Sequence, residues 1–284
     1  MPLVTSKELL IKAQKEGYAV GAFNANNLEY IQAIVESATE EKAPVILQVS
    51  QGAIKYAGLE FVTEIVKIAA EQAPIPVVLH LDHGTSFEQN VQCLRAGFTS
   101  LMYDGSLEPL EKNITITSKI CEIAHSVGIP LEAELGRVAG SEEGHNEAEI
   151  EELKTNPAQA REFVEKTGCD SLAIAIGSVH RMQTKEASLD IERLKKIRRT
   201  IDTPLVLHGG SGVSEKSIRD GIKNGLAKIN VATQLNMAFS NGVKEGLKKY
   251  PDEVDPRKFL TEAKKAVKEI VRYHIRLFEC NGKG

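Results

Sequence analysis

Apolar residues along the chain fall into eight short runs that alternate with longer amphipathic stretches. In the first such stretch, Ile31, Ile34, Val35 and Ala38 recur every three to four residues, which is the spacing of one helix face. Because each short run precedes a stretch of this kind, the pattern predicts eight parallel strands, each followed by a helix. The predicted strands are Tyr18–Asn24, Val45–Ser50, Val77–His83, Ser100–Gly105, Leu131–Gly136, Ser171–Gly177, Pro204–Gly210 and Lys228–Thr233.

Eight strand–helix units favour an α/β fold in which the strands close into a (β/α)8 TIM barrel, over an open doubly wound sheet of eight strands. The chain has 284 residues, close to the roughly 250 residues of a typical barrel. No linker divides it, so we predict a single domain over residues 1–284. Two connections, 137–156 and 178–189, exceed the usual length of roughly two to six residues, and we expect them to act as lids.

Amphipathic segments at both ends add helices to the eight units. Thr5 stands three residues before Glu8 and opens a segment that stops at Gly17, which predicts an N-terminal helix capped by the threonine. After Tyr250 the chain ends in a long helical pattern, and its apolar face needs a partner surface on its own barrel or on another subunit. The apolar residues of that pattern include Phe259, Ala263, Val267, Ile270 and Phe278.

Composition narrows the class of protein. Hydrophobic residues form 42% of the chain and charged residues 26%, which suits a globular protein with a large core. The net charge of -4 gives no general attraction for nucleic acid or for an anionic membrane. Since no signal peptide and no apolar run of about 18 residues occurs, we expect a cytoplasmic protein. The widely spaced cysteines, expected to be buried free thiols, are Cys93, Cys121, Cys169 and Cys280.

Histidines stand at the carboxyl ends of three predicted strands, where barrel enzymes build their active sites. His83 ends the third strand, His180 follows the sixth, and His208 lies at the end of the seventh. Three neutral imidazoles that leave a fourth position open are the pattern of a catalytic zinc site. We therefore predict that these three histidines bind Zn²⁺. The histidines interpreted as ordinary core or surface residues are His80, His125, His145 and His274.

Carboxylates accompany these histidines. Glu132 and Glu134 are two residues apart on the fifth predicted strand, so both side chains point into the barrel. Buried carboxylates are costly unless they are paired, hydrogen-bonded or close to a metal. Asp104, on the neighbouring strand, is expected to support a histidine or to bind a second metal ion. A structural salt bridge to an arginine or lysine is the alternative for this group.

Small residues follow the seventh and eighth strands. The segments 209–212 (GGSG) and 230–233 (NVAT) each lead into a predicted helix. Backbone N–H groups approach an anion closely at such turns, and these two loops are the recurrent phosphate site of barrels. The sequence therefore predicts a substrate that contains phosphate.

Cleavage of a carbon–carbon bond beside a carbonyl needs an electron sink, which a barrel supplies as a Schiff-base lysine inside a strand or as a metal. No predicted strand contains a lysine in its interior, and Lys228 stands at the start of the eighth strand, opposite the catalytic end. A metal is therefore the expected sink for such chemistry.

Five motifs stand in order at the strand ends: LHLDHG at 79–84, EAELG at 132–136, GSVH at 177–180, LHGGSG at 207–212 and KINVAT at 228–233. Together they resemble the class II, zinc-dependent ketose-bisphosphate aldolases, above all fructose-bisphosphate aldolase. The segment 251–260 (PDEVDPRKFL) also resembles the C-terminal region of that family. The resemblance implies cleavage of a ketose bisphosphate into dihydroxyacetone phosphate and a three-carbon aldehyde phosphate, two triose phosphates.

The resemblance also implies roles for individual residues. Zinc on the three histidines would bind the ketone and the adjacent hydroxyl of the substrate. Asp82 matches the proton-transfer acid on the aldehyde-side oxygen, and Glu142, on the loop 137–156, matches the glutamate that exchanges the proton at the nucleophilic carbon. Asp104 and Glu134 match a position for a second divalent ion or for support of the first, with Glu132 beside them.

Substrate contacts follow from the same motifs. Arg257 matches an arginine that the family supplies from a neighbouring subunit, so the resemblance implies a homodimer or homotetramer. Asn24 and Ser50 resemble residues near the far phosphate. The segments expected to hold dihydroxyacetone phosphate contain Gly209, Gly210, Ser211, Asn230, Val231, Ala232 and Thr233.

Two residues depart from the family pattern. Arg181 stands where the family has glycine, directly after His180, and Ser141 stands where some relatives have an acid. Arg181 adds bulk and charge where the family contacts a phosphate or a monovalent cation, and an altered choice of substrate is one interpretation.

Three other functions compete with cleavage of fructose 1,6-bisphosphate. Tagatose 1,6-bisphosphate differs from it at one hydroxyl group, which the motifs do not discriminate. A zinc hydrolase on the same barrel would need no bisphosphate cradle, so the two small-residue turns argue against it. A binding protein that has lost activity would not need the full set of three ligands, acid and base.

Overall fold

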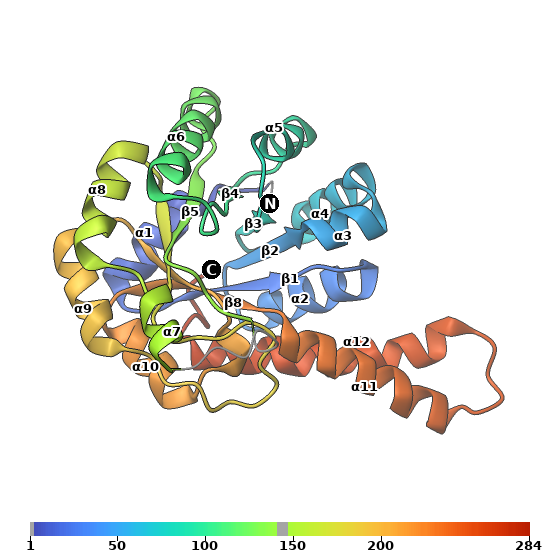
Figure 1. Ribbon diagram of the computed structural model, residues 1–284. Coiled ribbons are helices and arrows are strands. Elements are labelled where there is room, and N and C mark those ends of the chain that lie inside the picture. Colours follow the sequence, from blue (N-terminus) through green and yellow to red (C-terminus); the bar gives the residue numbers. More distant parts are fainter. Residues whose placement is uncertain (1–2, 141–146) are drawn as a thin grey trace.

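Eight parallel strands form one sheet in the computed structural model, which describes residues 3–140 and 147–284 (Figure 1). Hydrogen bonds join the strands in the order β3-β2-β1-β8-β7-β6-β5-β4. All eight predicted strands are therefore present: the second has its predicted bounds, and the other seven are shortened or shifted at their ends. The strands are β1 Val20–Asn24, β2 Val45–Ser50, β3 Val77–Asp82, β4 Leu101–Tyr103, β5 Leu131–Leu135, β6 Ser171–Ile174, β7 Leu205–Leu207 and β8 Leu226–Val231.

The two edge strands of this sheet, β3 and β4, meet and close it. Ser100, directly before β4, pairs with His80 of β3 as a parallel bridge. The backbone N–H of Leu81 donates to the carbonyl of Ser100 at 3.1 Å. The predicted (β/α)8 TIM barrel is thus confirmed, and the carboxyl ends of all eight strands meet at one end of the barrel.

Helices surround the barrel and cover its outer face (Figure 1). Their starts follow ordinary capping chemistry: the side chain of Asn27 accepts from the N–H of Tyr30 before α2, and Ser86 accepts from Gln89 before α5. The helices are α1 Ser6–Glu16, α2 Leu28–Glu40, α3 Gln51–Ala57, α4 Leu59–Gln72, α5 Phe87–Ala96, α6 Leu110–Ser126, α7 Glu147–Leu153, α8 Pro157–Thr167, α9 Ile191–Thr200, α10 Glu215–Lys223, α11 Thr233–Lys249 and α12 Pro256–Leu277, with a short 3-10 turn, η1, at Gly210–Gly212.

The predicted N-terminal helix forms as α1 and stops at Gly17, but its predicted side-chain cap is wrong. Thr5 occupies the N-cap position, but its hydroxyl accepts no hydrogen bond from an N–H of the helix. The next residue anchors the helix instead, since the hydroxyl oxygens of Ser6 and Ser100 lie 2.8 Å apart in the buried base of the barrel.

The position of Lys228 corrects a second prediction. Strand β8 begins at Leu226, two residues earlier than expected, because Leu226 and Ala227 are fully buried and continue the apolar run. Lys228 therefore lies inside a strand, and it is itself fully buried. The expectation that no strand interior contains a lysine is wrong, and the argument against a Schiff base needs another basis.

Helices α11 and α12 form an antiparallel hairpin that projects from the barrel (Figure 1). Two glycines allow the close approach of the two helices: a β-carbon on Gly242 would lie 2.5 Å from the Cα of Ala263, and one on Gly246 would lie 2.8 Å from the Cα of Phe259. Farther along α12, Lys268 forms ion pairs with Glu36 and Glu40 of α2. The second half of the C-terminal helix therefore finds its partner surface on its own barrel.

All four cysteines are free and buried, as predicted. Burial raises the pKa of the Cys93 thiol and of the Cys169 and Cys280 thiols to about 12. Among the helices of the described ranges, none is both long and apolar enough to cross a bilayer.

Candidate metal and phosphate site

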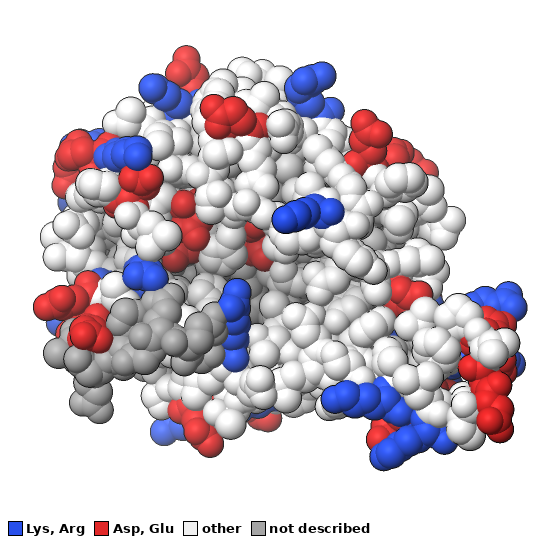
Figure 2. Space-filling model, turned by 45° about the vertical axis from the view of Figure 1, so that its right-hand side comes forward, with Lys and Arg blue, Asp and Glu red and all other residues white. Residues whose placement is uncertain are grey.

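A cavity of about 500 Å³ opens at the carboxyl ends of the strands. Figure 2 shows the molecule hollowed on this face, with acidic side chains inside the hollow. The residues that line it are Asn24, Gln48, Ser50, Asp82, His83, Asp104, Ser106, Leu107, Glu134, Arg137, Val138, Gly140, Val179, His180, Arg181, Gly209, Ser211, Asn230, Ala232, Thr233 and Asn236.

The three predicted histidines meet although they are far apart in the sequence: His83 and His180 line this cavity, and His208 is buried beside them. One ring nitrogen from each of His83, His180 and His208 lies within 4.8 Å of the corresponding atoms of the other two. The ring centroids of His83 and His208 are 4.6 Å apart, and those of His83 and His180 are 5.2 Å apart. Strand ends β3 and β7 and the loop after β6 thus bring together a set of nitrogens that could hold a metal ion.

Carboxylates fix the second nitrogen of two of these rings. Nδ1 of His83 lies 2.8 Å from Oδ2 of Asp104, and Nε2 of His208 lies 3.0 Å from Oε1 of Glu132. Each bond leaves the opposite nitrogen of the ring free to bind a metal. Metal-binding histidines in proteins commonly donate their other N–H to a carboxylate in this way.

Two buried atoms at the same place lack a hydrogen-bond partner among the described residues. They are Nδ1 of His208 and Oε2 of Glu134, which lie 3.0 Å apart. Unpaired polar atoms are costly in a protein interior, and a cation beside them would satisfy both. The arrangement therefore fits a metal ion, and His83, Asp104 and Glu134 form a second group of atoms that could hold one.

The surroundings of the histidines shift their pKa values in opposite directions. Burial disfavours charge on His83, but the hydrogen bond that His83 donates to Asp104 and the charges of Asp82 and Glu134 outweigh it and raise the pKa of His83 to about 10. Burial and the neighbouring positive charges of His83 and His208 lower the pKa of His180 to about 3. His180 is thus ready to bind a metal at neutral pH, whereas His83 must first release a proton.

Asp82 ends β3 beside this cluster and is held from two sides. Burial alone would raise the pKa of Asp82, but the charges of His83, His208 and Lys228 and a hydrogen bond from Asn24 lower it below its usual value. Oδ1 of Asp82 also lies 3.4 Å from Nδ2 of Asn230. Asp82 is therefore a fixed, charged carboxylate at the cavity wall at neutral pH.

Glu132 lies deeper in the barrel than Glu134 and does not line the cavity. Its carboxylate forms an ion pair of 2.8 Å with Lys228. The structural salt bridge considered for these carboxylates thus occurs at Glu132, whereas Glu134 and Asp104 face the cavity.

Gly209 and Ser211 form the wall opposite the carboxylates. Gly209 has a φ of +67°, and a β-carbon there would lie 3.0 Å from the carbonyl oxygen of Val179, so this turn requires glycine. The hydroxyl oxygen of Ser211 accepts from the N–H of Ala232 at 3.3 Å, directly before α11 begins at Thr233. The amino end of a 17-residue helix and two small-residue turns thus face the cavity, an arrangement suited to a phosphate group.

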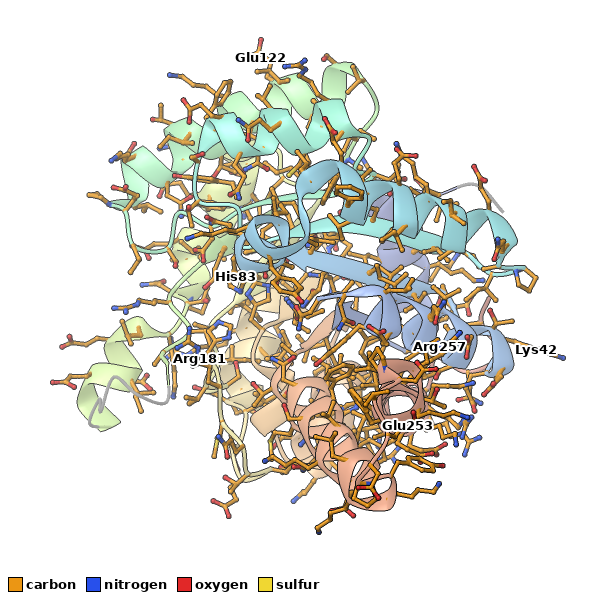
Figure 3. The ribbon with its side chains drawn as sticks, turned by 90° about the vertical axis from the view of Figure 1, so that its right-hand side faces the viewer. Lys42, His83, Glu122, Arg181, Glu253 and Arg257 are labelled. Atoms are coloured by element: carbon orange, nitrogen blue, oxygen red, sulfur yellow. The ribbon has the colours of Figure 1, made fainter. Side chains whose placement is uncertain are left out.

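Several predicted residues lie elsewhere. Gly210 and Val231 are buried behind the cavity wall and do not line it. Arg257 lies on the projecting hairpin, away from His83 (Figure 3). Its side chain is 87% exposed and pairs with Asp255, so it does not reach the cavity of its own chain. Glu142, Ser141 and His145 lie outside the described residues.

Polar residues that the sequence patterns did not single out also line the cavity. Nε2 of Gln48 donates a 2.6 Å hydrogen bond to Oδ1 of Asn24, the residue that holds Asp82. Gln48 stands two residues before Ser50 on β2, so strand alternation could have placed both on the same face. Oδ1 of Asn236 on α11 accepts from Asn26, in the loop after β1, and from Tyr30 of α2, and no local pattern predicts these contacts.

Arg181 lines the opening next to His180 and has a φ of +59°. Residues other than glycine rarely adopt this left-handed backbone conformation, because their β-carbon crowds the following carbonyl oxygen. The backbone at this position therefore has the conformation of a glycine, the residue expected there from the family pattern.

Comparison with known proteins agrees with this fold. A family model, fructose-bisphosphate aldolase class II, matches residues 4–283. A fructose-bisphosphate aldolase from Thermus caldophilus is 45% identical and is matched over 99% of both chains. The crystal structure of the YdjI aldolase from Escherichia coli K12 is 36% identical with a TM-score of 0.87, and it is covered over 99% of both chains. Fructose-bisphosphate aldolase from Campylobacter jejuni is 26% identical with a TM-score of 0.85, over 100% of this chain and 97% of that one.

The barrel, the histidine cluster and these likenesses define a metal-dependent carbon–carbon lyase. The chain belongs to the class II fructose-bisphosphate aldolase family.

Proposed function

We propose that this protein reversibly cleaves fructose 1,6-bisphosphate into dihydroxyacetone phosphate and glyceraldehyde 3-phosphate, with Zn²⁺ held by His83, His180 and His208. The observation that supports this most is that the cluster of three histidines adjoins a cavity lined by Asp82 and by the turn at Gly209. A bound zinc ion polarises a carbonyl and so withdraws electrons from the bond that breaks. The cytoplasmic location expected from the sequence stays a prediction.

Charge supports the presence of a cation at this site. Three carboxylates line the described part of the cavity, those of Asp82, Asp104 and Glu134, against two guanidinium groups, those of Arg137 and Arg181. Once His83 has released the proton that it loses on binding a metal, a bisphosphate would meet an excess of negative charge. A divalent ion at the histidines would offset it.

Asp82 and Glu142 would transfer the two protons of the reaction. In the cleavage direction, the carboxylate of Asp82 accepts the proton of the hydroxyl on the carbon that becomes the aldehyde, and the reverse reaction returns it. Asn24 and Asn230 hold this carboxylate in place. Glu142 is proposed to donate a proton to the nucleophilic carbon of dihydroxyacetone phosphate, on the family resemblance alone.

The phosphate of the dihydroxyacetone half would bind at Gly209, Ser211 and Thr233, where small residues and the start of α11 admit an anion. Asn24 and Ser50, on the other side of Asp82, are proposed to lie near the second phosphate. Arg257 would complete the site of a neighbouring subunit, in a homodimer or homotetramer.

A cleavage assay on chelator-treated protein tests this proposal. Removal of metal should abolish cleavage of fructose 1,6-bisphosphate, and added Zn²⁺ should restore it. Metal analysis of the untreated protein identifies the ion, and tagatose 1,6-bisphosphate assayed in parallel gives the sugar preference. Full activity in the chelator would overturn the metal mechanism, and faster cleavage of the tagatose compound would reassign the substrate.

The Schiff-base alternative is tested separately, since Lys228 lies inside β8. Its ammonium group bonds both oxygens of Glu132 and does not line the cavity. Borohydride added with substrate should therefore leave activity unchanged. Inactivation by covalent attachment of substrate to Lys228 would contradict the proposal.

A further inference from the structure

Beneath the cavity, buried polar side chains form a continuous path across the barrel interior. Nζ of Lys228 on β8 lies 2.8 Å from Oε2 and 3.0 Å from Oε1 of Glu132 on β5. Oε1 of Glu132 lies 3.0 Å from Nε2 of His208. On the other side, Nζ of Lys228 lies 3.4 Å from Nε2 of His80, whose Nδ1 lies 2.8 Å from the hydroxyl of Ser100.

This path is not explained by packing alone. Lys228, Glu132, His80 and His208 are each at most 2% exposed. Burying an ion pair is expensive, and similar barrels fill this layer with apolar side chains. A pair retained at such cost calls for a function that apolar residues would not serve.

The ion pair of Lys228 and Glu132 contacts one particular nitrogen of His208, Nε2. A carboxylate only accepts hydrogen bonds, so the proton of His208 must lie on Nε2 for the 3.0 Å contact with Glu132 to form. When the ring is neutral, as it must be to bind a metal, Nδ1 of His208 presents a lone pair, and this nitrogen lies 3.0 Å from Oε2 of Glu134. The path therefore selects which nitrogen of His208 carries the proton and which one carries the lone pair.

Lys228 orients the carboxylate that makes this selection. Its ammonium group bridges both oxygens of Glu132 and so fixes the plane of the carboxylate. His80 limits the position of the ammonium group from the far side, and Ser100 and Ser6 hold His80 through hydroxyl contacts of 2.8 Å. The support extends from the metal ligand to the N-terminal helix.

We propose that Lys228 is a positioning residue of the metal site: it orients Glu132, and Glu132 holds the proton of His208 on Nε2 so that Nδ1 is available to the metal. This inference rests on the metal site of the proposed function and assigns a purpose to the one lysine inside a strand in residues 3–140 and 147–284. It makes Lys228 a determinant of metal affinity at a distance from the substrate.

Zinc affinity and the His208 tautomer test the proposal, both measured on the whole chain. Lys228→Met removes the ammonium group at similar volume. The variant should bind Zn²⁺ about 10- to 100-fold more weakly in competition with a chromophoric chelator. In the metal-free protein, at a pH high enough for the His208 ring to be neutral, ¹⁵N chemical shifts should place the proton on Nε2 in the wild type and should indicate a mixture of tautomers in the variant. Lys268→Met, which removes ion pairs between α12 and α2, is the matched control and should change neither.

A double variant separates positioning from folding. In Lys228→Met/Glu132→Gln, the carboxylate that loses its ammonium partner is replaced by a neutral amide. The amide oxygen can still accept a hydrogen bond from Nε2 of His208. The amide N–H₂ can point toward His80, whose Nε2 lies 3.9 Å from Oε2 of Glu132. We expect this variant to recover most of the zinc affinity and the Nε2–H tautomer. Urea unfolding of every metal-free variant reports its folding independently.

The outcomes are distinct. Unchanged zinc affinity and tautomer in Lys228→Met would overturn the proposal, as would a double variant that binds no better than the single one. If the single variant does not fold, the double variant decides. A wild-type His208 with its proton on Nδ1 overturns it without any variant. Failure of the wild type to bind zinc would contradict the proposed function, while the tautomer measurement on metal-free protein would still test the role of Lys228.

Discussion

The side-chain amide of Asn24 donates a 2.9 Å hydrogen bond to Oδ2 of Asp82 across the cavity wall. This bond fixes the orientation of the Asp82 carboxylate at the cavity. We expect Asp82→Ala to lose cleavage by at least about 100-fold, because proton transfer to the leaving oxygen is worth about that much. Exchange of the proton of dihydroxyacetone phosphate with solvent should persist, since it does not involve that oxygen. Coupled cleavage assays and NMR of the exchange measure the two steps.

Asp104→Ala is the control for this prediction. Asp104 holds His83 through the 2.8 Å contact, so its loss should weaken metal binding and lower both reactions together. An Asp82→Ala variant that loses exchange as well as cleavage would contradict the assigned role.

Glu142→Ala should show the opposite pattern. Glu142 is proposed to exchange the proton at the nucleophilic carbon. Its loss should therefore slow the exchange of solvent protons into dihydroxyacetone phosphate by about 100-fold or more. Zinc content should stay at the wild-type level, which atomic absorption can check. Wild-type exchange in this variant would remove Glu142 from the site.

Arg181→Gly should stabilise the protein. The left-handed backbone at Arg181 costs a residue with a β-carbon about 1–2 kcal/mol, and the added chain entropy of glycine takes back part of that gain. We expect a net rise of about 1 kcal/mol in the free energy of unfolding, measured in urea. Arg181→Ala keeps the β-carbon and should give no such gain. Equal stability of the two variants would mean that the backbone conformation is not strained.

His274 should make stability depend on pH. It is buried against Phe23 and Phe278 at the end of α12, and burial lowers its pKa from 6.5 to about 4. Between these values the unfolded chain binds a proton that the folded protein does not, so stability falls as pH drops below 6.5. At about 1.4 kcal/mol per unit of pKa, the loss from pH 7 to pH 5 is about 2 kcal/mol.

Replacing this histidine should remove that loss. Urea unfolding at pH 7 and pH 5 should show a pH difference about 2 kcal/mol smaller in His274→Phe than in the wild type. His125→Phe, at a partly exposed histidine beside Asp170, serves as the control. The same pH difference in wild type and His274→Phe would contradict the prediction.

Arg257→Ala should mainly raise the KM for bisphosphate. A guanidinium group binds phosphate through its fixed fork of donors, so its loss is expected to raise KM by about tenfold while kcat changes little. Because Arg257 lies outside its own cavity, mixing this variant with one inactive through Asp82→Ala should restore low KM in hybrid oligomers. Unchanged kinetics would remove Arg257 from the site.

Local sequence patterns predicted the barrel well because each strand–helix unit shows its pattern of apolar residues within a short stretch of the sequence. The buried face of α2 at Ile31, Ile34 and Val35 follows from their spacing alone. The ends of strands were less predictable: Leu226 and Ala227 extend β8 because its neighbours bury them, and neighbours are not visible in a window of sequence.

The site was predictable where residues stand at strand ends, since the fold itself brings these together. His83, His180 and His208 belong to that group. Gln48 acquires its place from a bond to Asn24, and Lys228 from a bond to Glu132 on a strand 96 residues away. Such partners follow from the closed sheet, so the pairing of Lys228 with Glu132 could be found only in the structure.

The buried thiols make the chain its own reporter of local opening. Alkylating reagents react with the thiolate form of cysteine. This form is scarce while burial keeps the pKa of Cys93 and Cys280 at about 12. Modification of each thiol therefore requires the surrounding segment to open. The cysteines lie on α5, on α6, before β6 and after α12, so the rate at each would measure the motion of a different sector of the barrel.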